Sequence, residues 1–464
     1  MHTNTIFVQK PETKDTICEN IMNTIIDRVF SYLDDQPLPK LLSRNQLVSP
    51  YSKSNHNTFR VMSYNILADS LRHKHEEADR PPYETKYLDW QYRAPLLVSE
   101  IKGYNPDILC LQEVDVDNTT LHENFQENYH IYFKKRTQDK MDGCMTLVKK
   151  DKYRVLEAHY LEYFHDVNDP VLNRDSICII LALQSVNSQD DSVLIVANTH
   201  LLFNTNRGEI KIAQIYLALK ACSDLAFKYK KRDVHIIYAG DFNSIPQSAI
   251  YEFIRRGEFD FREVKGSYLS GQKLGGFVNT KWHRSLADFL VANVNKYRYS
   301  DRGREEKLDF LKTWLCHLKK INLIFRESKG ELQKIEYDFQ DMNLEFDPRQ
   351  NENWMLWNDF YMMSAYGNFQ KFYYGLQHKK YRSEVNYPNY STFEPLYTHR
   401  TAETILTVDY IWYCSRYSQK GKKLKLTSLY ELPRLDQGLK VHVFPNKTYP
   451  SDHLSLIADF EIGS

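Results

Sequence analysis

The sequence lacks a strong net charge of either sign. Its 464 residues include 61 basic and 60 acidic side chains, which leaves a formal charge of +1. No global field therefore favours a polyanionic partner, so any affinity for phosphate must come from a local site or from a metal ion. The overall charge neither implies nor excludes nucleic acid as a partner.

Long apolar runs and clustered cysteines are also missing. No segment approaches the roughly 20 apolar residues that cross a bilayer, and the first residues, MHTNTIFVQKPETKD, contain no basic region followed by an apolar stretch. The seven cysteines are scattered, and Cys110, Cys178 and Cys414 lie in apolar runs where a reduced thiol packs as a small hydrophobe. These absences argue against a membrane protein and against a zinc knuckle. We expect a soluble cytoplasmic protein, with the nucleus as the alternative location.

The composition that is present, 42% hydrophobic and 26% charged, is typical of a globular protein with a sizeable core.

We divide the chain into an N-terminal extension over residues 1–56 and a domain over residues 57–464. In the extension, apolar residues recur every four positions and predict one amphipathic helix over residues 17–33. Docking of this helix on the domain is preferred to binding of a protein partner, although amphipathicity alone does not choose. Residues 267–390, charged and aromatic with a predicted helix at 304–325, are interpreted as an insertion within the domain.

Short β-branched and aliphatic runs alternate with helical segments through the rest of the domain. Strands are predicted at 59–64, 107–112, 144–148, 177–183, 193–199, 234–239, 408–414 and 454–460, and helices at 88–102, 209–229 and 247–256. Some strands follow one another directly and others are separated by helices, which favours mixed sheets. We therefore predict an α/β fold, a four-layer sandwich of two mixed β-sheets flanked by helices.

Polar residues stand beside five of these predicted strands, four times at the carboxyl end and once just before the strand. The segments are MSYN with Asn65, CLQEV with Glu113, ANTHL with His200, AGDFNS with Asp241 and Asn243, and SDHL with Asp452 and His453. Ligands of α/β sheets collect where strand ends meet, so one pocket lined by all five segments is expected. Singly each segment is a weak signal, since a lone strand-end carboxylate is usually solvated. Together, carboxylate and amide oxygens suit Mg²⁺ or Mn²⁺, and imidazoles suit a phosphoryl oxygen.

The same segments resemble a known family. SYNIL, LQEV, THLL, GDFNSIP, TVDYIWY and SDHL, in this order, are similar to the exonuclease-endonuclease-phosphatase superfamily of metal-dependent phosphoesterases. The stretches WQYRAPLLVSEIKGYNPDILCLQEV and THLLFNTNRGEIKIAQIYLAL resemble its deadenylase-like branch, and the Angel family most of all. The resemblance covers about residues 58–264 and 395–462.

The resemblance implies a metal centre. Glu113 would be the principal ligand of Mg²⁺, or alternatively Mn²⁺, with Asn65 beside it and Asp452 nearby. Asp241 would orient the attacking water, and Asn243 would hold a phosphate oxygen or a second metal ion. We expect Gly240 to let the chain leave its strand sharply, so that both of these side chains point into the pocket.

Histidines complete the implied site. His453 would face the scissile phosphate with its other nitrogen bonded to Asp409, and His200 would donate to a nonbridging phosphate oxygen. Residues implied in substrate binding are His200, Asn243, Asn204, Thr398 and His399. The chain departs from the family at Thr205, where related sequences usually have proline, and at His399, where deadenylases carry an asparagine that helps to seat adenine.

Three functions follow from this resemblance. The preferred one is Mg²⁺-dependent hydrolysis of 2′,3′-cyclic phosphates at RNA 3′ ends by an in-line water, leaving a 2′,3′-diol. The alternative is 3′-to-5′ exonucleolysis of a poly(A) tail, which uses the same centre. The third is a catalytically silent adaptor in mRNA metabolism, which we disfavour because a scaffold has no use for a desolvated cluster of carboxylates.

Overall fold

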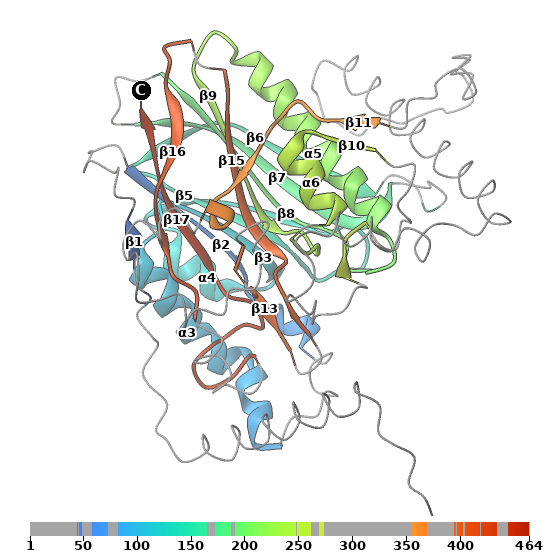
Figure 1. The fold of residues 1–464 in the computed structure, drawn as a ribbon. Coiled ribbons are helices and arrows are strands. Elements are labelled where there is room, and N and C mark those ends of the chain that lie inside the picture. The colour runs from blue at the N-terminus through green and yellow to red at the C-terminus, as the bar shows by residue number, and fades with distance from the viewer. Residues whose placement is uncertain are drawn as a thin grey trace, which may run out of the picture.

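Two mixed β-sheets pack face to face, and helices cover the outer face of each, in the computed structural model (Figure 1). The structure describes residues 44, 46–48, 58–72, 82–164, 167, 172–186, 191–246, 248–260, 269–272, 355–368, 394–395, 397–401, 404–417, 419–433 and 444–463. The four layers match the predicted fold class, which is confirmed. The predicted helices at 17–33 and 304–325 lie outside the described residues.

The first sheet has seven strands in the order β1-β16-β17-β2-β3-β5-β4. They are β1 (Gln46–Val48), β2 (Thr58–Asn65), β3 (Ile108–Asp115), β4 (Tyr129–Lys135), β5 (Asp142–Lys149), β16 (Lys423–Tyr430) and β17 (Leu456–Gly463). Strands β2 and β3 are parallel, and all other neighbours in this sheet are antiparallel.

The second sheet has six strands in the order β12-β15-β9-β8-β7-β6. They are β6 (Tyr153–Phe164), β7 (Asn173–Ser185), β8 (Val193–His200), β9 (Val234–Asp241), β12 (Met363–Ser364) and β15 (Asp409–Tyr417). Here β8 and β9 form the parallel pair. Two ribbons complete the strands, β10 (Glu258–Asp260) with β11 (Met355–Trp357), and β13 (His399–Arg400) with β14 (Ile405–Leu406).

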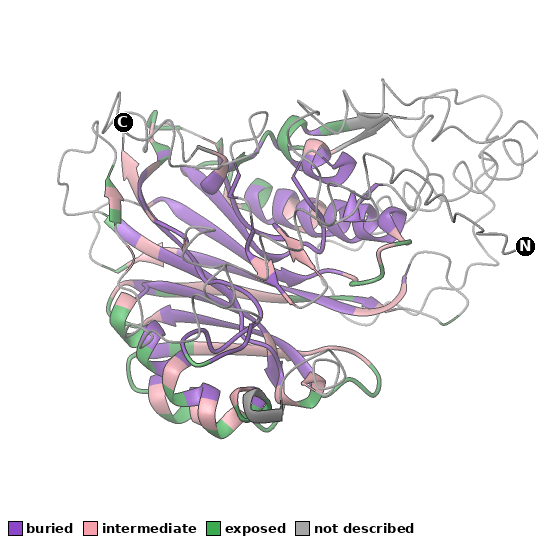
Figure 2. Cartoon of the chain, turned by 60° about the horizontal axis from the view of Figure 1, so that its bottom comes forward, coloured by how far each residue is buried: buried purple, intermediate pink, exposed green. Residues whose placement is uncertain are grey.

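Helices form the outer layers. The first sheet is covered by α3 (Trp90–Tyr104) and α4 (Thr119–Phe125), and the second by α5 (Gly208–Lys228) and α6 (Ala249–Arg256) (Figures 1 and 2). Short 3₁₀ turns are η1 (Asp69–Leu71), η2 (Pro82–Leu88) and η5 (Tyr366–Asn368). Helix α6 begins at the capping residue Ser248, which accepts from the Tyr251 amide, and ends at Gly257 in the left-handed conformation. Among the described helices, none combines the length and apolar character that a membrane span requires.

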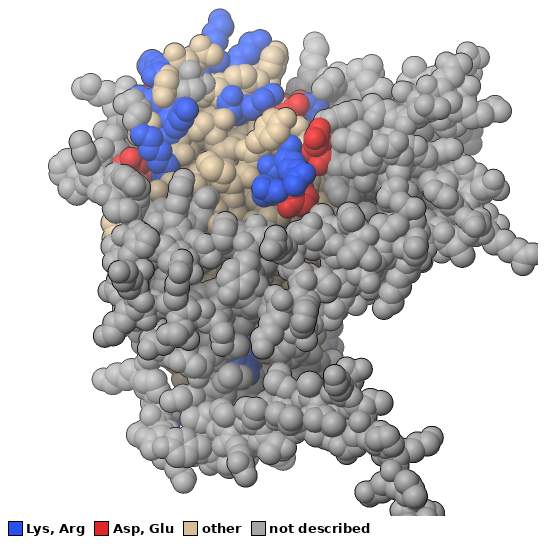
Figure 3. All heavy atoms as spheres, in the orientation of Figure 1, with Lys and Arg blue, Asp and Glu red and all other residues tan. Residues whose placement is uncertain are grey.

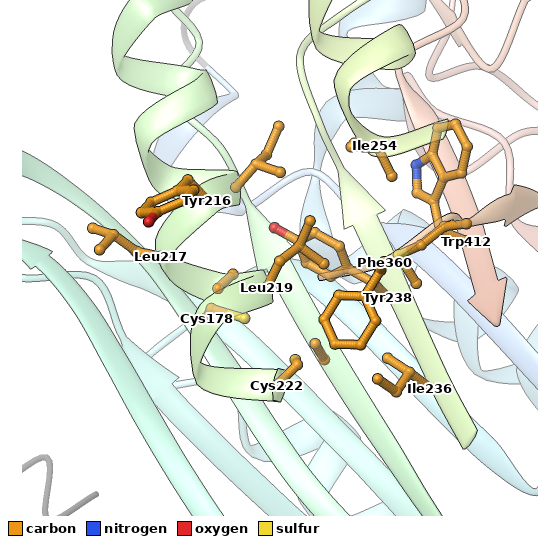
Figure 4. Packing of buried hydrophobic residues seen from close by; sticks show 14 of the residues in the cluster. Cys178, Tyr216, Leu217, Leu219, Cys222, Ile236, Tyr238, Ile254, Phe360 and Trp412 are labelled. Atoms are coloured by element: carbon orange, nitrogen blue, oxygen red, sulfur yellow. The ribbon is translucent and has the colours of Figure 1, made fainter. Parts of the chain in front are cut away.

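Three apolar layers hold the four structural layers together, because strand side chains alternate between the two faces. Along β9, Ile236 and Tyr238 pack against the α5 side, whereas Ile237 and Ala239 pack between the sheets. Figure 4 shows Tyr238 of β9 and Trp412 of β15 beneath the two helices of the second sheet. Both faces of the central strands are therefore covered by apolar layers, and the polar side chains of the site lie at the strand ends.

The eight predicted strands and three predicted helices all correspond to observed elements, with ends displaced by up to four residues. Three long strands, β4, β6 and β16, and the short helix α4 were not predicted. Strands β4 and β6 are the outer strands of their sheets, and many of their side chains are only half-buried. Charged residues and histidine interrupt their apolar runs, so these strands lack the continuous pattern by which the other strands were predicted.

Candidate active site

The two parallel strand pairs place their carboxyl ends at the same end of the sandwich. Asn65 at the end of β2 lies beside Gln112 of β3, and His200 at the end of β8 lies beside Asp241 at the end of β9. The two pairs meet across the sheets, because the Asn65 amide nitrogen is 3.2 Å from Glu113 Oε1 and 3.2 Å from Asp241 Oδ2. This is the convergence of strand ends that the sequence predicted.

Glu113 reaches the pocket through a β-bulge. The register of β3 against β5 shifts between Gln112 and Val114, and Glu113 has φ of +55°. Gln112 points between the sheets and bonds Asn198 at 2.8 Å. The extra residue interrupts the alternation of side chains, so that Glu113 lies beside Asn65 in the pocket and does not follow Leu111 to the outer face. The Ala68 amide donates to Glu113 Oε2 at 3.3 Å and helps to hold the carboxylate.

The turn after β9 differs in one respect from the expectation. Strand β9 continues through Gly240 to Asp241, and the sharp departure occurs at Asn243, which has φ of +45°. The Asn243 amide donates to Asp241 Oδ1 at 2.8 Å and closes the turn. Gly240 is required for another reason, because a Cβ at this position would lie 1.9 Å from the carbonyl oxygen of Thr199 on β8. Glycine thus permits close packing inside the sheet, and Asn243 makes the turn.

His453 is held by a chain of hydrogen bonds. Its Nδ1 lies 2.8 Å from Asp409 Oδ2, and the same oxygen accepts from the Thr398 hydroxyl at 2.6 Å. Burial alone would lower the pKa of His453, but the nearby carboxylates of Asp409 and Asp452 raise it well above its ordinary value. His453 is therefore a cation, with Nε2 directed toward Asp241 Oδ2 at 3.8 Å.

His200, unlike His453, is uncharged. Burial, followed by the positive charge of Arg136, lowers the pKa of His200 to about 3, so the ring is neutral. With the Asn243 amide donating to Nε2 at 3.2 Å, the ring proton lies on Nδ1. That nitrogen has no hydrogen-bond partner among the described residues and lies 4.0 Å from Glu113. It can donate to an oxygen of a bound ligand.

The acidic side chains outnumber the cations at this centre. Burial and the Asp409 charge raise the pKa of Asp241 to about 7, which shows how unfavourable another negative charge is here. Two sets of three residues each bring their potential metal-ligand atoms within 4.8 Å of one another. One set is His399, Asp452 and His453, and the other is Asp241, Asp409 and His453. His453 is engaged by Asp409 in a charged hydrogen bond, so we regard Glu113, Asp241 and Asp452, rather than His453, as the groups suited to a hard cation.

A pocket of about 800 Å³ opens over this cluster. The predicted site residues that line it are Glu113, His200, Asp241, Asn243, His399, Asp452 and His453. Asn65, Thr398 and Asp409 lie behind them and bond to them. Asn204, implied in substrate binding, is not among the lining residues, and its side-chain oxygen accepts from the Asn206 amide at 2.9 Å.

Several residues of the pocket were not predicted. Arg136, Lys140 and Arg174 line one wall, and the first two belong to the β4–β5 turn, which escaped notice together with β4. Lys211 in the first turn of α5 is fully buried, and its ammonium donates to the Asn243 carbonyl at 2.7 Å and to Gln272 at 2.5 Å. The one signal for Lys211 was a lysine in the otherwise apolar register of the predicted helix.

Comparisons with known proteins agree with this geometry. The family described as Endonuclease/Exonuclease/phosphatase family matches residues 62–315. Protein angel homolog 2 of Bos taurus is 30% identical over 442 residues, which is 89% of this chain and 72% of that protein. The Homo sapiens protein angel homolog 2 is 29% identical over 465 residues, covering 94% of this chain and 76% of that one.

Two solved structures are also similar to this chain over most of its length. The crystal structure of ANGEL2, described as a 2′,3′-cyclic phosphatase in complex with adenosine-2′,3′-vanadate, superposes with a TM-score of 0.61 at 25% identity. The match covers 91% of this chain and 99% of that one. A second crystal structure of ANGEL2 gives a TM-score of 0.61 at 26% identity, over 90% of this chain and 98% of that one.

Proposed function

Because the chain belongs to the endonuclease/exonuclease/phosphatase family and, within it, to the Angel proteins, we propose that it hydrolyses the 2′,3′-cyclic phosphate at RNA 3′ ends. Its membership makes it a phosphoester hydrolase, and the cyclic phosphatase ANGEL2 motivates the choice of substrate. Conversion to a diol requires two hydrolyses. One water opens the ring to a monophosphate, and a second releases inorganic phosphate and leaves both hydroxyls free.

One observation carries the proposal, namely the convergence of a carboxylate and two differently charged imidazoles on one point. Asp241 Oδ2 lies 3.5 Å from His200 Nε2 and 3.8 Å from His453 Nε2. Asp241 is placed to accept a proton from the attacking water. The His453 cation is placed to stabilise charge on the phosphoryl group and to give its Nε2 proton to the departing ribose oxygen.

Asp409 and His200 support these roles. Asp409 fixes the His453 ring through Nδ1 and stabilises its positive charge, so that the acidic proton lies on Nε2. The neutral His200 offers its Nδ1 proton to a nonbridging phosphate oxygen without adding a charge beside Asp241. The proton donor and the proton acceptor are thus separate side chains, with His453 Nε2 and Asp241 Oδ2 3.8 Å apart.

We propose Mg²⁺ as the cofactor, with Mn²⁺ as a substitute. The donor set fits, because Glu113, Asp241 and Asp452 supply carboxylate oxygens, and the acids of the cluster outnumber its cations. Glu113, with Asn65 beside it, would hold the ion. When bound, it would neutralise charge that develops on phosphoryl oxygens.

The test is an end-group assay on one synthetic RNA prepared with either a 2′,3′-cyclic phosphate or a hydroxyl-ended A-tail. We expect Mg²⁺-dependent formation of the diol without shortening, abolished by EDTA and by Glu113→Gln. The exposed Arg255→Gln variant, which loses only a contact with Glu252 on α6, serves as the matched control. Stepwise shortening of the A-tail with the cyclic end untouched would instead identify a 3′-to-5′ exoribonuclease. No turnover of either RNA would favour an adaptor.

A further inference from the structure

One wall of the pocket carries positive charge that the reaction above does not use. This wall is built by the β4–β5 turn of the first sheet and the start of β7 in the second, and it is lined by three cations, Arg136, Lys140 and Arg174, and one acid, Asp175. The two segments are joined, since the Thr137 hydroxyl donates to Asp175 Oδ1 at 2.8 Å. The wall is thus a fixed surface to which both sheets contribute.

The three cations differ in how far they are neutralised. Arg136 pairs with the buried Asp142, although its Nε has no hydrogen-bond partner among the described residues. Arg174 forms no ion pair within the described part of the chain, and its guanidinium bonds only the oxygens of Asn173. Burial, and then the neighbouring Arg207, lower the pKa of Arg174, while the carboxylates of Glu209 and Asp175 oppose this shift.

Basic residues at the other end of the sandwich are different. Figure 3 shows lysine and arginine side chains gathered along the upper edge of the view, where the chain turns between β15 and β16. There Lys228 pairs with Glu157 at 2.7 Å and Lys420 with Asp191 at 3.2 Å. The charge at that end is partly compensated by ion pairs, whereas Arg174 at the pocket forms none with the described residues.

An exposed aromatic ring stands next to the basic wall. Phe203 lines the pocket and is 70% exposed, on the loop that leaves β8 beside the start of β7, because Ile177 of β7 is paired with His200. The loop is anchored on either side of the ring, since the Leu202 amide donates to Gln214 at 3.0 Å and the Asn206 amide to Asn204 at 2.9 Å. The ring is therefore presented to solvent by an ordered backbone.

One nucleotide of single-stranded RNA can contact both groups. Its phosphate binds a guanidinium that has no ion pair, and its base stacks on an exposed aromatic ring. Resting on the proposed function, we propose that Arg174, Arg136 and Phe203 form a subsite for the nucleotide that precedes the terminal one. The phosphate that links this nucleotide to the terminal one would bind the arginines, and its base would stack on Phe203. The substrate is then an RNA chain of at least two nucleotides rather than a free cyclic nucleotide.

The experiment compares adenosine 2′,3′-cyclic phosphate, the dinucleotide ApA ending in a cyclic phosphate, and the same dinucleotide with an uncharged methylphosphonate linkage. In the wild-type protein we expect kcat/KM for the charged dinucleotide to exceed that for the mononucleotide by about ten- to a hundredfold, the range of a charged hydrogen bond. The methylphosphonate should lose most of this ratio. Arg174→Gln should reduce the ratio by about tenfold or more, and Phe203→Ala should reduce it with either linkage.

The control is Arg255→Gln, which should leave the ratio at its wild-type value. A wild-type ratio near one, or a ratio that Arg174→Gln does not change, overturns the subsite. If the wild-type protein hydrolyses neither cyclic phosphate, the proposed function has failed, and the subsite is tested by fluorescence anisotropy with a labelled, 3′-phosphorylated dinucleotide. Weaker binding of the methylphosphonate form, and equal binding of both forms by Arg174→Gln, would then support it, whereas equal binding of both forms by the wild type would refute it.

Discussion

Substitution of Gly240 by alanine tests how the site is positioned. Gly240 lies in β9 with Thr199 of β8 and Tyr410 of β15 as its register partners. It has φ of +143°, and an added Cβ would lie 1.9 Å from the Thr199 carbonyl oxygen. Carbon and carbonyl oxygen of neighbouring strands ordinarily approach to about 3.3 Å. The methyl group can therefore be accommodated only if β8 and β9 separate.

The expected cost has two parts. Separating the strands here weakens about two backbone hydrogen bonds, at roughly 1 kcal/mol each, and alanine at this φ costs about 1–3 kcal/mol. Together these give about 3–5 kcal/mol. With an unfolding entropy of about 2.1 cal/mol/K per residue, 1 kcal/mol corresponds to roughly 1.2 °C for about 400 residues, so we expect Gly240→Ala to lower Tm by about 4–6 °C.

Thermal unfolding followed by far-UV circular dichroism measures this change. The matched control is Gly103→Ala in α3, where an added Cβ meets no atom within 4 Å. Alanine is the better helix former, so this variant should be stabilised by about 0.5–1 kcal/mol. Gly240→Ala with the wild-type Tm would refute the argument that close packing, rather than the turn, requires glycine at this position.

Three other substitutions follow from the structure. Asp409→Asn should lower kcat for the cyclic phosphate by about 10²- to 10⁴-fold with little change in KM, because the amide cannot stabilise the His453 cation; steady-state kinetics measure this, and an unchanged kcat contradicts it. Lys211→Met leaves the Asn243 carbonyl without its buried donor and should destabilise the protein by about 2–4 kcal/mol in urea unfolding; an unchanged midpoint counts against this. Burial raises the pKa of Glu394 to about 7, above the unfolded value near 4.5, so its folded form binds a proton that the unfolded chain does not. The stabilisation should therefore be fully present below about pH 4.5, and the free energy of unfolding should fall by about 3 kcal/mol as the pH rises to 7. Glu394→Gln should flatten this pH dependence, and an unchanged pH dependence in the variant would disprove the assignment.

The sequence predicted the central strands because their burial on two faces leaves continuous apolar runs. Strand β9, with the run from Val234 to Ala239, is buried throughout. Strand β6 is mostly half-buried at the edge of its sheet and mixes Glu157, His159 and Glu162 with apolar residues, so its pattern resembles that of a loop or a surface helix. The outer strands are thus defined by their neighbours more than by their own residues.

The oxygen-bearing side chains of the site were predictable from their place beside strands, and the basic wall was not. The bulge at Glu113 depends on the register with β5, which no local pattern reports. Arg174 stands at the start of a strand, where an arginine is usually just solvated. The contact between Lys211 and Gln272 joins residues 61 positions apart. Gln272 falls within the segment interpreted as an insertion, and nothing in the sequence links it to α5.

The position of β17 has a consequence for the newly made protein. This strand lies between β16 and β2, so a segment that is made almost 400 residues after β2 occupies an interior place in its sheet. His453 stands just before it and Asn65 stands almost 400 positions earlier. A nascent chain that stops before His453 has neither a finished sheet nor this histidine. Activity should consequently appear only after β17 has been made, and polypeptides that terminate before it should be inert toward RNA.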